Sequence, residues 1–149
     1  MGKITAAITG VGAYLPEYRL TNAILETMVD TNDEWITTRT GIKERRILKE
    51  PGKGTSYMAI KAAQDLIEKK GIDPKTIDLV LLASATPDMP VASTGAYVAT
   101  QIGATNAFSY DLMAACSSFL FGMSTASSYI ESGRYKRVLL IGQIKCPQS

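Results

Sequence analysis

The sequence predicts an α/β fold in which a mostly parallel, mixed sheet is layered by helices. Strand and helix patterns alternate along the chain, as they do in proteins with parallel sheets. Two continuous apolar runs of strand length, 78–85 and 136–142, are typical of strands covered on both faces. Residues 114–130 are apolar or small on every helical face, which predicts a central helix buried on all sides. The length of 149 residues suits one domain over 1–149.

The first third of the chain contains two strand patterns and two short helix patterns. Thr21 or Asn22 can cap the first helix, and Asn32 or Asp33 can cap the second, which Gly41 can end. In chain order, the predicted elements are a strand over 3–12, a helix over 20–30, a helix over 32–42 and a strand over 43–48.

The remaining chain begins with its clearest helix, over residues 54–71. Apolar residues recur there at helical spacing, between a Ser/Thr start and Gly71 at the end. The predicted elements after it are a strand over 78–85, a helix over 93–103, a strand over 107–113, a helix over 115–133 and a strand over 136–142.

Gly10 and Gly12 follow the first predicted strand, and Asp30 lies about twenty residues further on, which invites a dinucleotide-binding interpretation. However, Leu15 stands where that fingerprint requires Gly or Ala, and Pro16 blocks an immediate helix. We therefore expect only a tight turn at the end of a strand.

Composition excludes several classes of protein. The net charge of +2, with basic and acidic residues interleaved, predicts no nucleic-acid partner. No apolar run reaches the roughly 18 residues of a membrane span, and the N-terminus shows no convincing signal-cleavage site, so we expect a cytoplasmic protein without a membrane partner. Two cysteines without a histidine suit neither a disulfide framework nor a zinc site, so we expect free thiols, no metal and no cofactor.

Cys116 stands where the predicted helix over 115–133 begins. The unpaired N–H groups and positive dipole end of a helix N-terminus favour thiolate over thiol, which makes a nucleophile. The neighbouring alanines and serines leave room for an acyl chain to approach the sulfur. The alternative is a buried structural cysteine, because free cysteine behaves as a small hydrophobic residue.

Two stretches carry a resemblance to a known family. VDTNDEWITTRTGIKERRI (29–47) and AFSYDLMAACSSFLFGM (107–123) resemble the N-terminal half of β-ketoacyl-acyl-carrier-protein synthase III, and the match runs from about Lys3 through Gly142. The resemblance implies a thiolase-like fold of two similar α/β halves, with the nucleophilic cysteine on a buried helix at their junction. It also implies an acyltransferase that starts fatty acid synthesis, with acetyl-CoA as the expected primer.

The resemblance implies roles for five residues of this chain. Cys116 would take the acyl group from acyl-CoA, and malonyl-acyl-carrier protein would then be decarboxylated to attack the acyl-enzyme. The backbone N–H of Cys116 would be one oxyanion donor. Trp35 would stack on the CoA adenine, Thr31 would lie beside the same nucleotide, and Arg39 would meet its phosphates. Met89 would reach across a homodimer interface to bound the partner's acyl pocket. The alternatives are that Trp35 packs in the core, that Arg39 is only solvated, and that Met89 is a loop methionine without a special role.

The chain also departs from the family. The catalytic histidine and asparagine of the family come from a C-terminal half, and this chain has no histidine. After VLLIG (138–142) the family continues with small and acidic residues, whereas this chain reads QIKCPQS, and Cys146 matches no family position. A premature stop, a frameshift or a deliberately expressed half would each produce this ending. Two functions remain open: an acyltransferase that is incomplete here and inactive in condensation alone, or a non-catalytic half that persists by dimerising or pairing with another chain.

Overall fold

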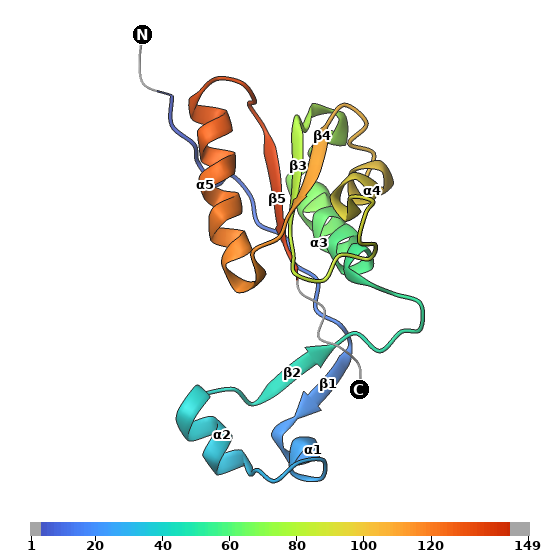
Figure 1. The fold of residues 1–149 in the computed structure, drawn as a ribbon, viewed down its shortest axis with the longest axis vertical. Helices are drawn as coiled ribbons and strands as arrows, with labels where there is room; N and C mark the ends of the chain where they lie inside the picture. The colour runs from blue at the N-terminus through green and yellow to red at the C-terminus, as the bar shows by residue number, and fades with distance from the viewer. Residues whose placement is uncertain (1–3, 144–149) are drawn as a thin grey trace. The chain divides into compact units, whose positions relative to one another are not determined.

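The computed structural model describes residues 4–143, which divide into two compact units (Figure 1). One unit comprises residues 4–14 and 54–143 and is called the sheet unit here. The other comprises residues 15–53 and is called the hairpin unit. The sequence predicted one domain over 1–149, so this division was not foreseen.

The hairpin unit consists of a two-stranded sheet and two short helices. Its elements are β1 (Tyr18–Thr21), α1 (Asn22–Glu26), α2 (Asp33–Thr40) and β2 (Glu44–Ile47), and β1 pairs antiparallel with β2. Thr21 caps α1 and Asn32 caps α2, while Gly41 ends α2 with a φ of 70°. Both predicted helices and the second strand are therefore confirmed, although α1 is shorter than predicted. The strand β1 was missed.

Asn22 lies at the centre of the hairpin unit, where it is 2% exposed. Its side-chain amide donates to Asp33 Oδ1 (2.6 Å) and to the Ile42 carbonyl (2.8 Å), and its Oδ1 accepts from Arg45. One buried amide thus joins α1, α2 and β2, because each of its polar atoms finds a partner.

The sheet unit is built on three parallel strands in the order β4-β3-β5. In register, Leu79 of β3 lies opposite Phe108 of β4 and Val138 of β5. The elements of the sheet unit are α3 (Thr55–Lys70), η1 (Pro74–Thr76), β3 (Leu79–Ala83), α4 (Thr94–Gln101), β4 (Phe108–Leu112), η2 (Ala115–Ser117), α5 (Ser118–Glu131) and β5 (Val138–Gly142). This α/β arrangement, with helices on both faces of the sheet, confirms the predicted fold class (Figure 1).

The core of the sheet unit lies between the sheet and the helices α3 and α4. Every residue of β3 is buried, as its continuous apolar run predicted. The strand β5 instead alternates between partly buried and buried residues and ends at the exposed Gly142. The buried cluster consists of Ala59, Ala63, Ile77, Val80, Leu82, Val98, Ala99, Ile102, Ala104, Leu139 and Ile141.

The helix α5 covers the other face of the sheet. Gly122 packs so closely on β5 that a Cβ there would lie 2.5 Å from Leu140 Cδ1. The opposite side of the helix is open: Leu120 is 67% exposed, and Phe121 and Met123 on its flanks are also exposed. Phe119 is exposed too, but it lies against Gly142 of β5. The prediction that this helix is buried on all sides is therefore not fulfilled within the described chain, because the sheet covers only one side of the helix.

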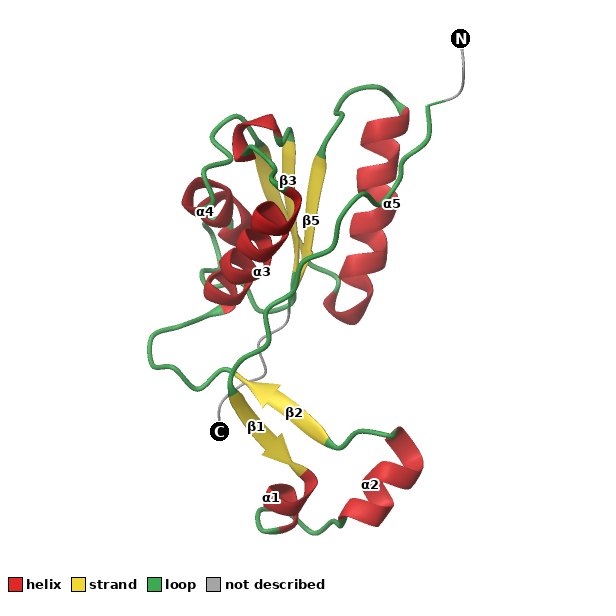
Figure 2. Cartoon of the chain, turned by 180° about the vertical axis from the view of Figure 1, so that it is seen from behind, coloured by secondary structure: helices red, strands yellow, loops and turns green. Residues whose placement is uncertain are grey.

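Residues 4–14 form no strand, so the prediction of a strand over 3–12 is wrong for the described part of that range. Figure 2 shows the segment as a loop. Its C-terminal part contacts α3: the Ala13 N–H donates to Asp65 Oδ2 (2.9 Å), and a Cβ on Gly12 would lie 2.6 Å from the Ala62 carbonyl oxygen. Gly12 therefore serves a close approach of the backbone to a helix.

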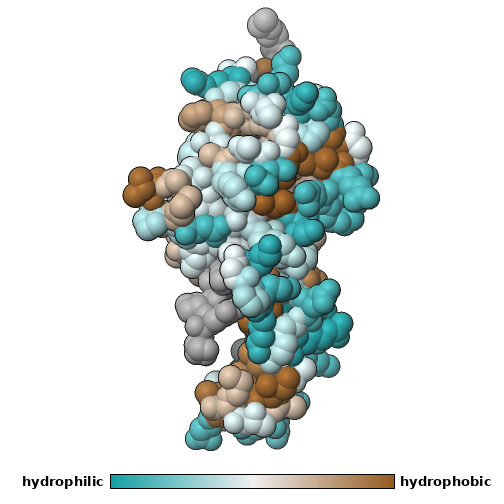
Figure 3. Space-filling view, turned by 90° about the vertical axis from the view of Figure 1, so that its right-hand side faces the viewer, coloured by the Kyte–Doolittle hydropathy of each residue, from teal (hydrophilic) through white to brown (hydrophobic). Residues whose placement is uncertain are grey.

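None of the helices within residues 4–143 is both long and apolar enough to span a membrane. On the face drawn in Figure 3, hydrophobic residues form several separate patches among hydrophilic ones.

Candidate active site

Cys116 lies in η2, the short turn that links β4 to α5. The sequence placed it in the first turn of the helix, but α5 begins only at Ser118, and the preceding turn is a 3-10 helix. Ala115 adopts a φ of 47°, in the left-handed region that L-residues rarely occupy. This conformation costs on the order of 1–2 kcal/mol for a residue with a Cβ. The chain is thus held in a sharp, strained turn directly before the cysteine.

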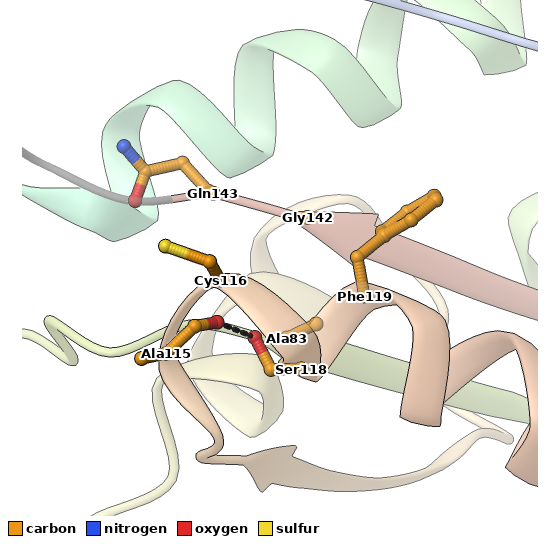
Figure 4. A pocket seen from close by; sticks show the side chains of 7 residues that line it. All are labelled: Ala83, Ala115, Cys116, Ser118, Phe119, Gly142 and Gln143. Atoms are coloured by element: carbon orange, nitrogen blue, oxygen red, sulfur yellow. Dashed lines mark hydrogen bonds between the residues drawn. The ribbon is translucent and has the colours of Figure 1, made fainter.

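A pocket of about 360 Å³ opens beside the cysteine (Figure 4). The Cys116 side chain is exposed, which argues against the alternative of a buried structural cysteine. The lining residues are Ala83, Ala115, Cys116, Ser118, Phe119, Gly142 and Gln143. They come from the ends of β3 and β5, from η2 and from the start of α5, so the pocket lies at the carboxyl edge of the parallel sheet.

Two polar groups near the sulfur differ in what they can still bind. The Ser118 hydroxyl donates to the Ala115 carbonyl (2.6 Å). No hydrogen bond within the described residues engages the backbone N–H of Cys116. This N–H can therefore serve as an oxyanion donor, as the resemblance implied.

Asp111, near the end of β4, fixes the start of α4 a few residues before the cysteine. Its carboxylate accepts hydrogen bonds from the Ser93 hydroxyl (2.9 Å), the Thr94 N–H (2.8 Å) and the Gly95 N–H (2.7 Å). The next N–H group that has no acceptor within the helix, that of Ala96, donates to Ser93 Oγ (3.1 Å). The helix terminus therefore has hydrogen-bond acceptors for N–H groups that have none within the helix.

Met89 lies in the loop between β3 and α4 and is 54% exposed. The loop is tied down beside it: the Ser56 N–H donates to the Asp88 carboxylate, and the Asp88 N–H donates to Thr94 Oγ1 (3.0 Å). The methionine is thus presented from an anchored loop.

Trp35 and Arg39 are neighbours on α2 of the hairpin unit. The Arg39 guanidinium carbon lies 4.5 Å from the centre of the Trp35 ring, a cation–π arrangement. Trp35 is 52% exposed, so core packing is not its role in this chain. Thr31 directly precedes Asn32, the cap of the same helix.

The start of α2 is also electrostatically fixed. Hydrogen bonds from Asn22 and from Thr37, with a smaller contribution from the charge of Lys43, lower the pKa of Asp33 below its ordinary value of 3.8. The Asp33 carboxylate is therefore held in its charged form beside the positive end of the helix dipole.

The structure thus pairs Trp35 with Arg39 and places Cys116 and Met89 in the other unit, while Cys146 lies outside the described residues. Sequence reasoning missed Phe119 and Gln143 as pocket residues. The expected departure from the family after VLLIG (138–142) begins at Gln143, and this was the signal available in the sequence. Within residues 4–143, no group of three or more His, Cys, Asp or Glu side chains could hold a metal ion.

Known proteins resemble this chain over almost all of its length. A family model for 3-oxoacyl-[acyl-carrier-protein (ACP)] synthase III matches residues 110–148. Beta-ketoacyl-[acyl-carrier-protein] synthase III 2 of Bacteroides thetaiotaomicron is 54% identical over 97% of this chain, and the Porphyromonas gingivalis synthase III is 55% identical over the same share. The chain spans only 43% of the length of each.

Solved structures show the same similarity in the fold. The crystal structure of 3-oxoacyl-[acyl-carrier-protein] synthase III from Aquifex aeolicus matches with a TM-score of 0.87 and 45% identity, over 97% of this chain and 45% of that one. The Thermus thermophilus synthase III matches with a TM-score of 0.83 and 39% identity, over 93% and 43%. In sequence and in its thiolase-like fold, the chain therefore resembles the N-terminal half of β-ketoacyl-acyl-carrier-protein synthase III.

Proposed function

We propose that this chain is the acyl-accepting half of an acyltransferase that starts fatty acid synthesis in the cytoplasm. In this proposal Cys116 takes an acyl group, with acetyl as the expected primer, from acyl-CoA. The acyl-enzyme then condenses with malonyl-acyl-carrier protein. The names of the relatives support this class of reaction. The observation that carries the proposal is an exposed cysteine, in a strained turn, at a pocket with an unused backbone N–H.

The first step is thioester exchange. The Cys116 thiolate attacks the carbonyl carbon of acyl-CoA, and the carbonyl oxygen becomes a tetrahedral oxyanion that the Cys116 N–H stabilises. The carbon–sulfur bond to CoA then breaks, and CoA leaves as a thiolate that takes up a proton. The methyl side chains of Ala83 and Ala115 and the absence of a Cβ at Gly142 leave space for a short acyl group in the pocket.

The hairpin unit supplies the proposed contacts to CoA. Arg39 stacks on Trp35, and the half-exposed indole retains ring surface on which an adenine can stack. The guanidinium can at the same time offer N–H groups to phosphate oxygens, because stacking leaves its edge free. Thr31, at the start of the same helix, is proposed to lie beside the nucleotide.

Condensation is proposed to require a second half. Decarboxylation of malonyl-acyl-carrier protein places negative charge on a thioester oxygen, and removal of one preorganised donor typically costs about 10²–10³ in rate. The 149 residues contain no histidine that could donate there. We therefore expect acyl transfer without condensation from this chain alone, and recovery of condensation when a histidine-bearing half is added.

A second candidate function is that of a non-catalytic half that persists by pairing. The observation that favours it is the open apolar side of α5, with Leu120 67% exposed. Contiguous apolar surface of this kind is typical of interfaces rather than of monomers. Homodimerisation would suit the exposed Met89 as well, which is proposed to bound the partner's acyl pocket. A well-behaved monomer in sedimentation, without binding of a hydrophobic dye, would contradict this candidate.

Labelled acetyl-CoA tests the proposed acyl transfer. The chain is incubated with it and digested, and the labelled peptide is identified by mass spectrometry. We expect label on Cys116, and we expect Cys116→Ser to remove it while Cys146→Ser retains it. Label confined to Cys146, or label that persists in Cys116→Ser, would refute the assignment. Release of labelled carbon dioxide from malonyl-acyl-carrier protein, with and without an added histidine-bearing half, tests condensation.

A further inference from the structure

The pocket beside Cys116 contains a hydrogen-bond acceptor that has no donor. The Oε1 atom of Gln143 is buried and finds no hydrogen-bond partner among the described residues. The rest of the residue is engaged: its backbone N–H donates to the Ala83 carbonyl (3.0 Å), and its Nε2 donates to Met58 Sδ (3.5 Å). The residue is therefore held at its backbone and at its carboxamide nitrogen, while its carboxamide oxygen stays unused.

An unused buried carbonyl oxygen is unfavourable in a folded protein. Its hydrogen bonds to water are lost on burial, and no protein donor among the described residues replaces them. Most buried polar atoms in native structures have partners, so an exception inside a pocket indicates that a ligand can supply the missing donor.

The position of Gln143 relates this acceptor to the cysteine. The residue directly follows β5, and both side chains line the same pocket. In Figure 4 the Gln143 carboxamide and the Cys116 side chain extend to the same side, with the carboxamide oxygen on the side of Cys116. The other oxygen-bearing side chain of the lining, Ser118, differs from Gln143 because its hydroxyl already has a hydrogen-bond partner, the Ala115 carbonyl to which it donates.

We propose that Gln143 Oε1 accepts a hydrogen bond from an amide N–H of the phosphopantetheine arm that carries the acyl group to Cys116. This inference rests on the proposed function, since it names a contact for the same substrate. The arm has two secondary amides, and each has one N–H to donate. Gln143 is thus a specificity-determining residue that selects an amide-bearing thioester carrier over an equally long carrier without an N–H.

Disulfide exchange tests the contact without any need for acyl transfer. The chain, with Cys146→Ser as background, is equilibrated with the symmetric disulfide of N-acetylcysteamine, which is the end of the arm and has one amide N–H. A parallel sample receives the disulfide of 2-mercaptoethyl acetate, in which an ester oxygen replaces that N–H. In each case the Cys116 thiolate attacks one sulfur and the other half leaves as a thiolate. Mass spectrometry gives the equilibrium constant for exchange with each disulfide, and their ratio measures the preference of the chain. The same two exchanges with glutathione give the reference ratio for a thiol that has no pocket.

We expect the chain to prefer the amide disulfide by about two- to tenfold relative to glutathione, which is the effect of one neutral hydrogen bond. Gln143→Met removes the acceptor at similar length and should abolish the preference, while Gln143→Glu retains an acceptor and should keep it. A wild-type ratio equal to that of glutathione, or an unchanged ratio in Gln143→Met, would overturn the proposal. If Gln143→Met does not fold, the ratios measured for the wild type and for Gln143→Glu still support or refute the proposed contact.

Two further arms identify the natural carrier and separate this inference from the proposed function. Cys116 acylation is followed with acetyl-CoA and with acetyl-acyl-carrier protein, in the wild type and in Gln143→Met. A rate reduced by the variant with only one carrier assigns the contact to that carrier, and a reduction with both assigns it to the shared arm. Absence of acylation throughout would refute the proposed function, whereas the disulfide ratio would still support or refute the role of Gln143.

Discussion

Asp111→Asn is predicted to destabilise the sheet unit, because one carboxylate holds the start of α4 against the end of β4. Oδ1 accepts from the Ser93 hydroxyl and the Gly95 N–H, and Oδ2 accepts from the Thr94 N–H. An asparagine can keep the first of these oxygens. Its NH₂ group would then stand where Oδ2 was, with its hydrogens directed at the Thr94 N–H.

The magnitude follows from this exchange. A helix N–H without an acceptor costs about 1–3 kcal/mol, and hydrogen bonds to a neutral oxygen are weaker than those to a charged one. Loss of the negative charge at the helix N-terminus costs a further 0.3–1 kcal/mol or so. We therefore expect a loss of about 2–4 kcal/mol, which is a large fraction of the roughly 5–15 kcal/mol that stabilises a typical protein.

Urea denaturation followed by circular dichroism measures this loss. Asp73→Asn is the matched control, because the Asp73 side chain also caps a helical turn but accepts, among residues 4–143, one exposed backbone hydrogen bond, from the Lys75 N–H (3.0 Å). We expect the control to lose less than about 1 kcal/mol. If Asp111→Asn loses no more than Asp73→Asn, the three hydrogen bonds do not stabilise the unit as argued.

Three further predictions concern the N-terminal loop, the stability of the chain in acid and its tyrosine titration in alkali. Gly12→Ala places a Cβ 2.6 Å from the Ala62 carbonyl oxygen and should cost about 1–3 kcal/mol in urea denaturation, so an unchanged midpoint would contradict the close contact. The lowered pKa of Asp33 contributes stability that is complete above its ordinary value of 3.8 and is lost as pH falls through the folded value; Asp33→Asn should remove this acid dependence from denaturation curves. Burial, together with a hydrogen bond that the neutral Tyr110 hydroxyl donates to Tyr129, raises the pKa of Tyr110 from 10.0 to about 12, so its stabilising effect is complete below pH 10.0 and is lost as pH rises towards 12. Absorbance titration should lose its last tyrosine step in Tyr110→Phe, and an identical titration would refute this.

Local signals were sufficient to predict the helices. Asn32 and Gly41 mark the ends of α2 in the sequence, and they cap it in the structure because a side-chain oxygen and a left-handed glycine satisfy groups within the same few residues. The apolar run of β3 likewise predicted a strand with no exposed residue.

Features that depend on distant residues could not be predicted in the same way. Residues 4–14 have the composition of a strand, yet within the described chain they lie against α3, which is more than forty residues away in the sequence. The left-handed φ of Ala115 has no sequence signature, since alanine rarely adopts it. The pocket itself combines the ends of β3 and β5 with the start of α5, and only the sheet topology brings these together.

The polar centre of the hairpin unit has a thermodynamic consequence. The apolar cluster of the chain belongs to the sheet unit, whereas the hairpin unit is organised around the amide of Asn22 and buries few apolar side chains, among them Ile36 and Leu48. The heat capacity change of unfolding scales with apolar surface, so this unit should contribute little to it. Calorimetry should therefore show that the enthalpy of unfolding of residues 15–53 changes little with temperature. Because Trp35 and Arg39 lie in this unit, a nucleotide that binds there would raise its melting temperature by mass action.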